Sequence, residues 1–341
     1  MSQLKRWVTQ LIQYERTDAI TKAKSDITTI ATSLSYQPLP IFLYDDTEES
    51  DEGLAARIEG ITGAIATDDI LLYQYPSKWY GYRFDRQFIH LMRQKGVQVI
   101  LFIHDLDSFT GGTGLSWDDE ASLLNSASLL ISHGSSMTDW LKKNGIHIPI
   151  VNLQLFDFLH PLNRPLSKDL KRCVTFAGWL PKAPFLVDYR EDVPLDVYGT
   201  LGNLTLSKKV YYHGEFSQDE LLKVLPRDNF GLSWADNVGI VRHHDYQRLN
   251  NPLKVSLYLS LGLPVIVWQE ASLAPLVTSF NLGLTISSIS EIAPQLESLS
   301  DDELYQIKER SNAFSKLLQN GYFTRSALLE AEKILFLGGL N

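Results

Sequence analysis

A lysine in the first turn of an expected helix is the residue of this chain best placed to bind an anion. Residues 245–270 predict a polar loop, a short helix and an apolar strand, in that order. Asn251 is a favourable N-cap, Pro252 suits the first helical position, and Gly262 ends the helix. Lys254 then lies beside free backbone N–H groups, at the positive end of the helix dipole. An anion would be stabilised by both features and by the ammonium, so the pattern indicates a phosphate site.

The alternative for Lys254 is a solvated lysine on a surface helix. Two observations favour the binding site: Lys254 is the only charge between Arg248 and Glu270, and a long polar loop precedes the helix. Asn250 and Asn251, where the loop meets the helix, are assigned to the same site. Glu270, just beyond the next strand, is a candidate for binding hydroxyl groups of the ligand.

A second positive charge follows another expected strand. The sequence AGWLPKAPF places Gly178 where the backbone can approach a ligand, and it places Lys182 on the same rim. A simple turn is the alternative for this segment. A diphosphate needs more than one cationic contact. The presence of Lys254 therefore favours a ligand-binding role for Lys182 over a simple turn.

The loop at residues 235–250 is long for a compact domain, which usually indicates function or disorder. It carries His243, His244 and Tyr246 among other polar residues. Consecutive histidines lack the i, i+4 spacing of two metal ligands on one helix face, so a metal site is disfavoured. We predict a polar loop that covers a bound ligand.

Polar residues also follow a strand in the first half of the chain. The sequence VILFIHDLD places His104, Asp105 and Asp107 at the strand end. Asp105 or, failing that, His104 would suit a general base for an attacking hydroxyl if the reaction inverts the configuration of the sugar. If the reaction retains the configuration, no such base is required and Asp105 would only orient the acceptor. Two alternatives remain open: Asp105 and Asp107 could hold a divalent metal, or these side chains could cap a helix or form a loop salt bridge.

Aromatic side chains follow a neighbouring strand. Gln74, Tyr75 and Trp79 belong to a run that suits stacking on sugar rings, although aromatic packing beneath a loop fits equally well. An acidic run at residues 45–52 falls at a strand-to-helix turn. Adjacent carboxylates there are more typical of a dipole-favoured helix start than of a metal site.

Alternating strands and helices must position these residues, and this alternation predicts parallel sheets wound on both faces. Expected strands are residues 7–12, 41–44, 70–73, 97–103, 129–132, 148–151, 174–176, 195–198, 210–213, 230–233, 265–267 and 284–286. Expected helices are residues 18–34, 49–61, 82–95, 117–126, 135–144, 217–224, 252–261, 273–280, 301–318 and 324–336.

The segment at residues 156–171, rich in proline, interrupts the alternation and is the predicted linker. It separates a first domain at residues 1–155 from a second at 172–320, and a last helix within 321–341 is expected to pack back on the first domain. The predicted fold class is α/β, with two doubly wound Rossmann-like domains facing a cleft. Ligands of such sheets bind at the C-terminal ends of the strands.

Composition limits the classes of function. The chain has 341 residues, 44% of them hydrophobic and 21% charged, as in globular proteins. Its net charge of -9 argues against a general nucleic-acid binder, which would need a basic face. Cys173 is the only cysteine and cannot form an internal disulfide. No transmembrane segment or signal peptide is apparent, so a cytoplasmic location is expected.

Several segments together resemble a known family. They are LLYQYP, the FD pair at residues 84–85, VILFIHD, FAG followed by a basic residue, the whole of residues 245–270, and GYFTR near the end. This set is similar to the bacterial glucosyltransferases that extend O-linked N-acetylglucosamine (GlcNAc) on serine-rich-repeat adhesins of the accessory secretion system. That family is related to galactofuranosyltransferase-like enzymes.

The resemblance implies a GT-B fold and a metal-independent transferase that uses a UDP-sugar, without a cofactor, and is a homo-oligomer. At matching positions it implies that Lys254, Tyr246 and Lys182 contact UDP, and that Asp105 and Gln74 face the acceptor. The family can have arginine where this chain has Lys182, and a lysine cannot make the bidentate contact of an arginine.

The predicted function is transfer of a hexose, with glucose favoured and GlcNAc as the other choice, from a UDP-sugar to GlcNAc on a serine-rich-repeat protein. UDP leaving from the site of Lys254 and Lys182 would be stabilised as its charge grows. The alternatives are a UDP-sugar hydrolase or epimerase, and a non-catalytic sugar-binding subunit of a transferase complex.

Overall fold

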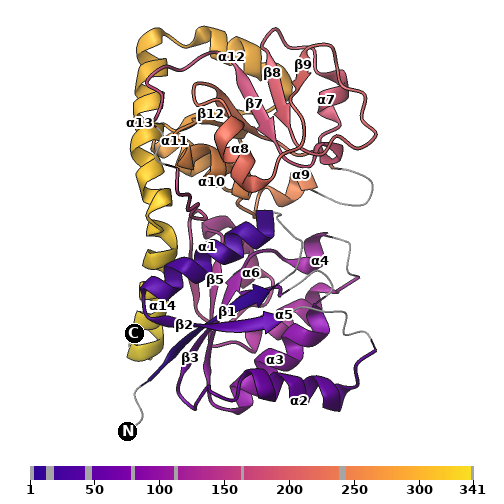
Figure 1. Cartoon of the computed structure of the whole chain (residues 1–341), viewed down its shortest axis with the longest axis vertical. Helices are drawn as coiled ribbons and strands as arrows, with labels where there is room; N and C mark the ends of the chain where they lie inside the picture. The colour runs from indigo at the N-terminus through magenta and orange to yellow at the C-terminus, as the bar shows by residue number, and fades with distance from the viewer. Residues whose placement is uncertain are drawn as a thin grey trace. The chain divides into compact units, whose positions relative to one another are not determined.

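The computed structural model of the chain describes residues 4–12, 19–42, 48–77, 81–110, 114–162, 165–237 and 243–338. The chain divides into two compact units, which Figure 1 shows with their helices and strands labelled. Unit 1 is built from residues 1–16, 20–154 and 323–341, and unit 2 from residues 17–19 and 155–322. Each unit contains its own six-stranded sheet.

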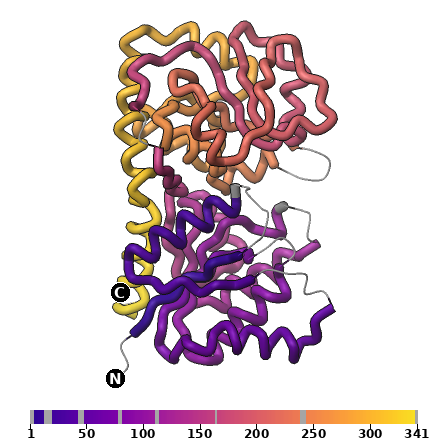
Figure 2. Tube along the Cα trace, viewed as in Figure 1, coloured from indigo at the N-terminus to yellow at the C-terminus, as the bar shows by residue number. Residues whose placement is uncertain are grey.

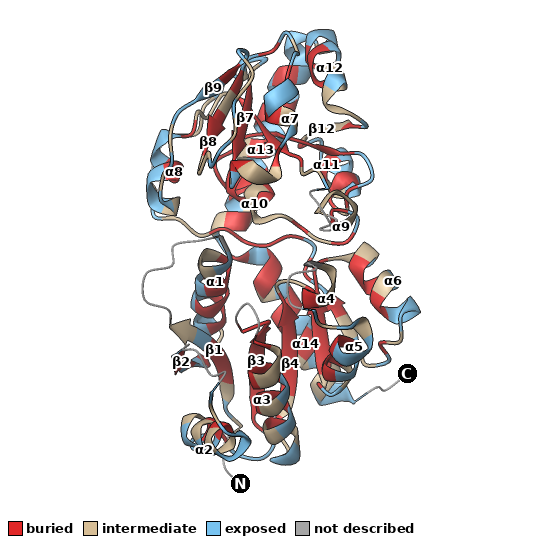
Figure 3. Cartoon of the chain, turned by 90° about the vertical axis from the view of Figure 1, so that its right-hand side faces the viewer, coloured by how far each residue is buried: buried red, intermediate tan, exposed pale blue. Residues whose placement is uncertain are grey.

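The strands of unit 1 are all parallel, in the order β2-β1-β3-β4-β5-β6. Their bounds are β1 (Arg6–Ile12), β2 (Tyr36–Phe42), β3 (Ile70–Tyr75), β4 (Gln98–Ile103), β5 (Leu129–Ser132) and β6 (Ile150–Asn152). Strands β3 and β4 are buried along almost their whole length, as Figure 3 shows in red. Their near-continuous apolar runs are typical of parallel strands that are covered on both faces.

The helices of unit 1 surround this sheet. They are α1 (Ala19–Ser33), α2 (Asp51–Ile61), α3 (Tyr82–Gln94), α4 (Asp107–Thr110), α5 (Trp117–Asn125), α6 (Ser135–Lys143) and, from the end of the chain, α14 (Tyr322–Leu337). Glu332 of α14 accepts hydrogen bonds from Arg6 Nε and from the hydroxyl of Tyr36, both at 2.8 Å. In Figure 2 the yellow end of the trace accordingly runs beside the indigo strands.

The strands of unit 2 are also parallel, in the order β12-β11-β10-β7-β8-β9. Their bounds are β7 (Val174–Ala177), β8 (Leu195–Tyr198), β9 (Val210–Tyr212), β10 (Phe230–Ser233), β11 (Val265–Trp268) and β12 (Gly283–Ile286). Counted within the unit, this is the strand order of dinucleotide-binding sheets, which reverses between β7 and β10. Ligands of such sheets bind at the point of reversal.

Helices of different lengths connect these strands. They are η1 (Leu180–Lys182), α7 (Phe185–Asp188), α8 (Gln218–Val224), α9 (His243–Tyr246), α10 (Leu253–Ser260), α11 (Ala274–Ser279), η2 (Ile289–Glu291), α12 (Ile292–Ser298) and α13 (Asp301–Gln319). Helix α10 packs directly on the sheet, because Gly231 of β10 has no Cβ. A Cβ there would lie 2.3 Å from the ring of Tyr258, whose hydroxyl accepts a 2.7 Å hydrogen bond from the N–H of Ala177.

Every predicted strand and helix has a counterpart, and the largest error concerns β2. The prediction placed this strand at residues 41–44, whereas it begins at Tyr36. The strand includes Pro38 and Pro40, which are tolerated because β2 is the edge of its sheet. Helices α4, α7, α9 and α12 were not predicted. The first three have four residues each and α12 has seven, which is at most two helical turns and too few to show a helical period.

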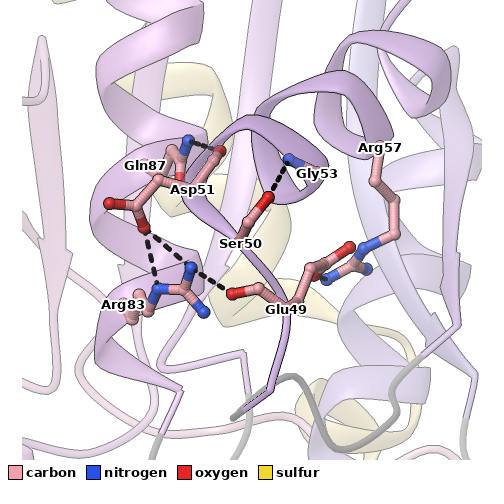
Figure 4. A network of polar contacts seen from close by, with 7 residues as sticks. All are labelled: Glu49, Ser50, Asp51, Gly53, Arg57, Arg83 and Gln87. Atoms are coloured by element: carbon pink, nitrogen blue, oxygen red, sulfur yellow. Dashed lines mark hydrogen bonds and ion pairs between the residues drawn. The ribbon is translucent and has the colours of Figure 1, made fainter.

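The acidic turn before α2 is a capped helix start with ion pairs, as Figure 4 shows. The Ser50 hydroxyl accepts the N–H of Gly53 at 3.1 Å, and the Asp51 carboxylate accepts Arg83 Nη2 at 2.7 Å. Glu49 pairs with Arg57 at 3.3 Å. The carboxylates of Glu49 and Asp51 thus lie at a helix start and form ion pairs, as the helix-start interpretation predicts. Asp45 and Asp46 lie outside the described residues.

The described part of the chain contains no helix that is both long enough and apolar enough to cross a membrane.

Candidate functional site

Unit 2 contains a cavity of about 330 Å³ at the reversal point of its sheet. Its walls come from the segments that follow β7 and β10, from α9, and from the first turn of α10. Five of the predicted ligand-binding residues line it: Gly178, Lys182, Tyr246, Asn250 and Lys254. Asn251 and Glu270 do not. Five of the seven residues therefore share one cavity.

Lys254 brings a desolvated cation into this cavity. Its ammonium lies 4.0 Å from the centroid of the Phe176 ring, and a Cβ on Gly178 would lie only 3.3 Å from Nζ. Burial, and secondarily the charge of Lys182, lower the pKa of Lys254 to about 8. Among the described residues no carboxylate forms an ion pair with Lys254. A half-buried cation with this environment favours an anionic ligand.

The start of α10 differs from the prediction. The N-cap is Pro252, not Asn251, and the helix begins at Leu253 without a side-chain cap. Asn251 is buried, and its Oδ1 accepts a 2.8 Å hydrogen bond from Ser272 Oγ in place of capping the helix. Without a side chain over it, the first turn of α10 presents backbone N–H groups at the cavity wall, where Pro252, Leu253 and Lys254 lie.

Two further polar side chains line the cavity, and one of them adds a second positive charge. Lys182, in η1, lies 5.5 Å from the ring of Trp179, whose side chain is 56% exposed at the rim. His243 also lines the cavity, and burial together with the charge of Lys182 lowers its pKa. Lys182 and Lys254 therefore place two positive charges around one space, which suits a ligand with more than one negative charge. His243 lines the same space as a neutral imidazole at neutral pH.

Asn250 and Tyr246 lie on the wall of the same cavity, whereas Glu270 lies elsewhere. Asn250 Oδ1 is buried and has no hydrogen-bond partner among the described residues, so it can accept a hydrogen bond from a ligand hydroxyl. Glu270 is exposed and forms an ion pair with Arg248, whose guanidinium stacks on Trp268 at 4.6 Å. This geometry does not support a ligand contact by Glu270.

An aromatic wall was missed by the sequence reasoning. The centroid of the His244 ring lies 4.1 Å from that of Trp268 and 5.2 Å from that of Trp234. The Nδ1 of His244 lies 2.8 Å from the carbonyl oxygen of Ala235. Trp234 itself lines the cavity. His244 is thus a packing residue of the loop, and within the described ranges no three His, Cys, Asp or Glu side chains are arranged to hold a metal ion. Nothing in the local sequence distinguishes Trp234 from a core tryptophan.

In unit 1 the end of β4 carries His104, whose ring is partly exposed and held in place. Its Nε2 lies 3.0 Å from Oε1 of Gln74, and its backbone N–H donates to Tyr75 O at 2.7 Å. Burial, followed by the charges of Lys24 and His133, keeps the pKa of His104 well below its usual range. His104 is therefore a neutral imidazole at neutral pH, able to accept a proton.

The aspartates after His104 are not a matched pair. Asp105 is partly exposed, and its Oδ1 accepts the N–H of Leu106 at 3.1 Å, within the turn that precedes α4. Asp107 is buried in α4, and its N–H donates to Glu120 Oε1 at 2.8 Å. Burial and repulsion by Glu120 raise the pKa of Asp107 to about 7. This arrangement does not favour a metal held by both aspartates.

The predicted sugar-stacking residues do not form an exposed platform. Gln74 and Tyr75 are each 0% exposed, and the hydroxyl of Tyr75 donates to Glu120 Oε1 at 2.7 Å. The prediction that Tyr75 and Gln74 contact the acceptor directly is therefore wrong in this structure, because both side chains lie in the core. Trp79 lies outside the described residues.

A buried cation in unit 1 was also missed. Lys24 of α1 is 7% exposed, and its ammonium donates to the carbonyls of Pro76 and Ser77, the latter at 2.9 Å. The positive charge of Lys24 lowers the pKa of His104, and only the effect of burial on this pKa is larger. Because its partners lie 52 and 53 residues away along the chain, no local pattern could reveal this role.

Comparisons with known proteins agree with this geometry. The family model for the N-terminal domain of glucosyltransferase 3-like proteins matches residues 5–155. The model for the C-terminal domain of the same proteins matches residues 174–331. Glucosyltransferase 3 of Streptococcus gordonii is 29% identical over 312 residues, which cover 91% of this chain and 92% of that protein.

Two more distant proteins are similar over almost the whole chain. Beta-1,6-galactofuranosyltransferase WbbI of Escherichia coli K12 is 27% identical over 338 residues, covering 94% of this chain and 96% of its own. A solved E. coli structure, described as trehalose-6-phosphate bound with UDP-2-fluoro glucose, superposes with a TM-score of 0.63 at 10% identity, covering 96% of this chain and 98% of the other. With both domain models matched in order, the chain belongs to the glucosyltransferase 3-like family and has the GT-B fold.

Proposed function

We propose that this protein is a glycosyltransferase that moves a hexose, with glucose favoured over GlcNAc, from a UDP-sugar to GlcNAc O-linked to a serine-rich-repeat protein. The observation that carries the donor half is the cavity of unit 2, where Lys254, Lys182 and His243 surround one space at the reversal point of the sheet. Membership of the glucosyltransferase 3-like family supports the reaction class. A cytoplasmic location and a homo-oligomeric state remain predictions from the sequence.

In this proposal the diphosphate of the donor binds at the start of α10. Lys254 and the open N–H groups of the first turn face the phosphates, and Lys182 supplies the second cation. Negative charge grows on UDP as the bond to the sugar breaks, so these groups stabilise the leaving group more strongly in the transition state. Tyr246 and Asn250 supply polar contacts from the same wall.

The groups that handle the acceptor lie at the end of β4 in unit 1. His104 is neutral and partly exposed, which suits it to take the proton of the attacking hydroxyl. Asp105 was the first choice from the sequence, but one of its oxygens already accepts the N–H of Leu106. We therefore propose His104 as the base and Asp105 as a residue that orients the acceptor.

UDP binding is expected to weaken as the pH rises through about 8, because Lys254 loses its proton near that value. The ammonium form is present below this pKa and attracts the diphosphate, whereas the neutral amine does not. Calorimetric titration of UDP at several pH values on both sides of the pKa measures the effect. The Lys254→Met variant should show a flatter profile, and an equally steep one would assign the pH dependence to another group.

Transfer should not require a metal ion. Among the described residues no metal-binding cluster occurs, and the proposed charge stabilisation uses lysines and helix N–H groups. We expect the transfer rate to be the same in excess EDTA and in added Mg²⁺ or Mn²⁺. A rate that is lost in EDTA and restored by one of these ions would contradict this prediction.

The reaction itself is tested with UDP-glucose or UDP-GlcNAc and a peptide that carries GlcNAc on serine. Mass spectrometry should show a peptide heavier by one sugar, together with stoichiometric UDP. UDP released without any change in the peptide would indicate a hydrolase, and an altered donor sugar would indicate an epimerase. The absence of turnover with every donor would favour a non-catalytic subunit.

A further inference from the structure

Gln74 is a fully buried amide whose NH₂ group is surrounded by acceptors. Its Nε2 lies 2.8 Å from the carbonyl oxygen of Thr9, 3.2 Å from that of Lys24 and 3.0 Å from Thr28 Oγ1. The Thr28 hydroxyl donates its own proton to Lys24 O at 2.9 Å, so towards Gln74 it acts as an acceptor. All three neighbours of Nε2 therefore accept hydrogen bonds.

This environment determines which way the amide points. In the opposite orientation Oε1 would meet three acceptors, and the interior would contain unsatisfied polar groups at considerable cost. The oxygen of Gln74 must therefore be the atom that faces His104 Nε2, at 3.0 Å. An amide oxygen can only accept, so His104 Nε2 carries the proton.

We infer that Gln74 is a positioning residue that selects the Nε2–H tautomer of His104 and leaves Nδ1 with the lone pair. Nδ1 is then the atom that accepts a proton or a hydrogen bond from a sugar hydroxyl. This inference rests on the proposed function for the catalytic use of Nδ1, but the tautomer itself follows from the hydrogen bonds alone. It also replaces the earlier assignment of Gln74 to the acceptor site.

Hydrogen bonds fix the position of Gln74, and with it the position of the oxygen that contacts His104. The backbone N–H of Gln74 donates to Thr9 Oγ1 at 2.9 Å, so strand β1 holds the residue at both its backbone and its side chain. The His104 ring also packs against Phe102, with 5.3 Å between centroids. A histidine supported in this way keeps one ring orientation and one tautomer, which is how second partners tune functional histidines.

The tautomer is tested directly by NMR on the full-length protein labelled with ¹⁵N-histidine, with the His104 signals identified by their loss in His104→Asn. We expect a protonated Nε2 and an unprotonated Nδ1 at neutral pH. A protonated Nδ1, or an imidazolium, in the wild-type protein overturns the inference. The measurement requires no Gln74 variant, so it stands even if such a variant fails to fold.

The functional consequence is tested with Gln74→Met, which keeps the length of the side chain but removes the acceptor. We expect kcat to fall by about 10–100-fold, with little change in the KM for the UDP-sugar, and the His104 signals to show a changed tautomer. The matched control is Tyr73→Phe, the neighbouring buried residue of β3, which loses one 2.7 Å hydrogen bond to Asp85. Its kcat and its His104 tautomer should match the wild type.

The two levels of this inference can fail separately. If the Nε2–H tautomer is observed but His104→Ala transfers sugar at the wild-type rate, the proposed role of His104 in transfer is wrong while the geometry of Gln74 stands. If Gln74→Met changes the tautomer but not kcat, Gln74 has no positioning role in the reaction. A KM effect equal to the kcat effect would likewise contradict it.

Discussion

Replacing His104 with alanine is expected to lower kcat for sugar transfer by about 10²–10⁴-fold, the usual contribution of a general base. The neutral imidazole at the end of β4 is lost, and the attacking hydroxyl then has only water to take its proton. The KM for the UDP-sugar should stay close to that of the wild type, because the cavity residues of unit 2 are unchanged. Steady-state kinetics with a GlcNAc-peptide measures both values.

Two variants make this experiment decisive. His90→Ala removes an exposed histidine of α3 in the same unit and should leave kcat unchanged. Asp105→Asn removes the charge of the other candidate but keeps the size of the side chain. If Asp105→Asn loses the larger part of kcat while His104→Ala retains it, Asp105 is the base and the assignment made here is reversed.

Replacing Lys254 with methionine is expected to weaken UDP binding by about 1.5–3 kcal/mol, the value of a charge-assisted hydrogen bond. This corresponds to an increase in Kd of roughly 10–150-fold. Methionine preserves the apolar stem that packs against Phe176, so the loss reports the ammonium. Isothermal titration calorimetry with UDP measures the change.

The same variant should make the ligand-free protein more stable, which separates loss of binding from loss of fold. Burial lowers the pKa of Lys254, so its charged form opposes folding below about pH 8, and this cost fades as the pH rises towards the unfolded pKa. Lys254→Met removes the cost at neutral pH and should raise Tm. The control Lys208→Ala, an exposed lysine of unit 2, should change neither Tm nor Kd. A lowered Tm together with an unchanged Kd would remove Lys254 from the site.

Most of the fold could be predicted because its signals are local. Buried parallel strands appear as short apolar runs, and the loops between them carry glycine and proline. Five residues that the sequence grouped together share the cavity of unit 2 for the same reason, since the ends of parallel strands meet at one edge of a sheet. The exception, β2, shows the limit: a strand that contains Pro38 and Pro40 is possible because it pairs on one side only, and the local sequence does not show which strand is the edge.

The details of the site depend on partners that are distant in sequence. Asn251 satisfied the local rules for an N-cap, but its side-chain oxygen instead accepts a hydrogen bond from Ser272, 21 residues later. Gln74 looked like an exposed polar residue after a strand, yet its amide is engaged by Thr9, 65 residues earlier, and by Thr28. A pattern of residue types cannot show which contacts form across the sheet, so buried polar residues were mistaken for ligand contacts.

The return of α14 to unit 1 has a consequence for biosynthesis. Arg6 and Glu332 are 326 residues apart, and Tyr36 and Glu332 are 296 apart, yet they meet at the edge of the first sheet. On the ribosome, the first sheet must therefore wait for the synthesis of α14 before this covering helix exists, while unit 2 is completed earlier. The half of the protein that is synthesised first is thus the half that matures last, and a prematurely terminated product would expose the strands that α14 protects.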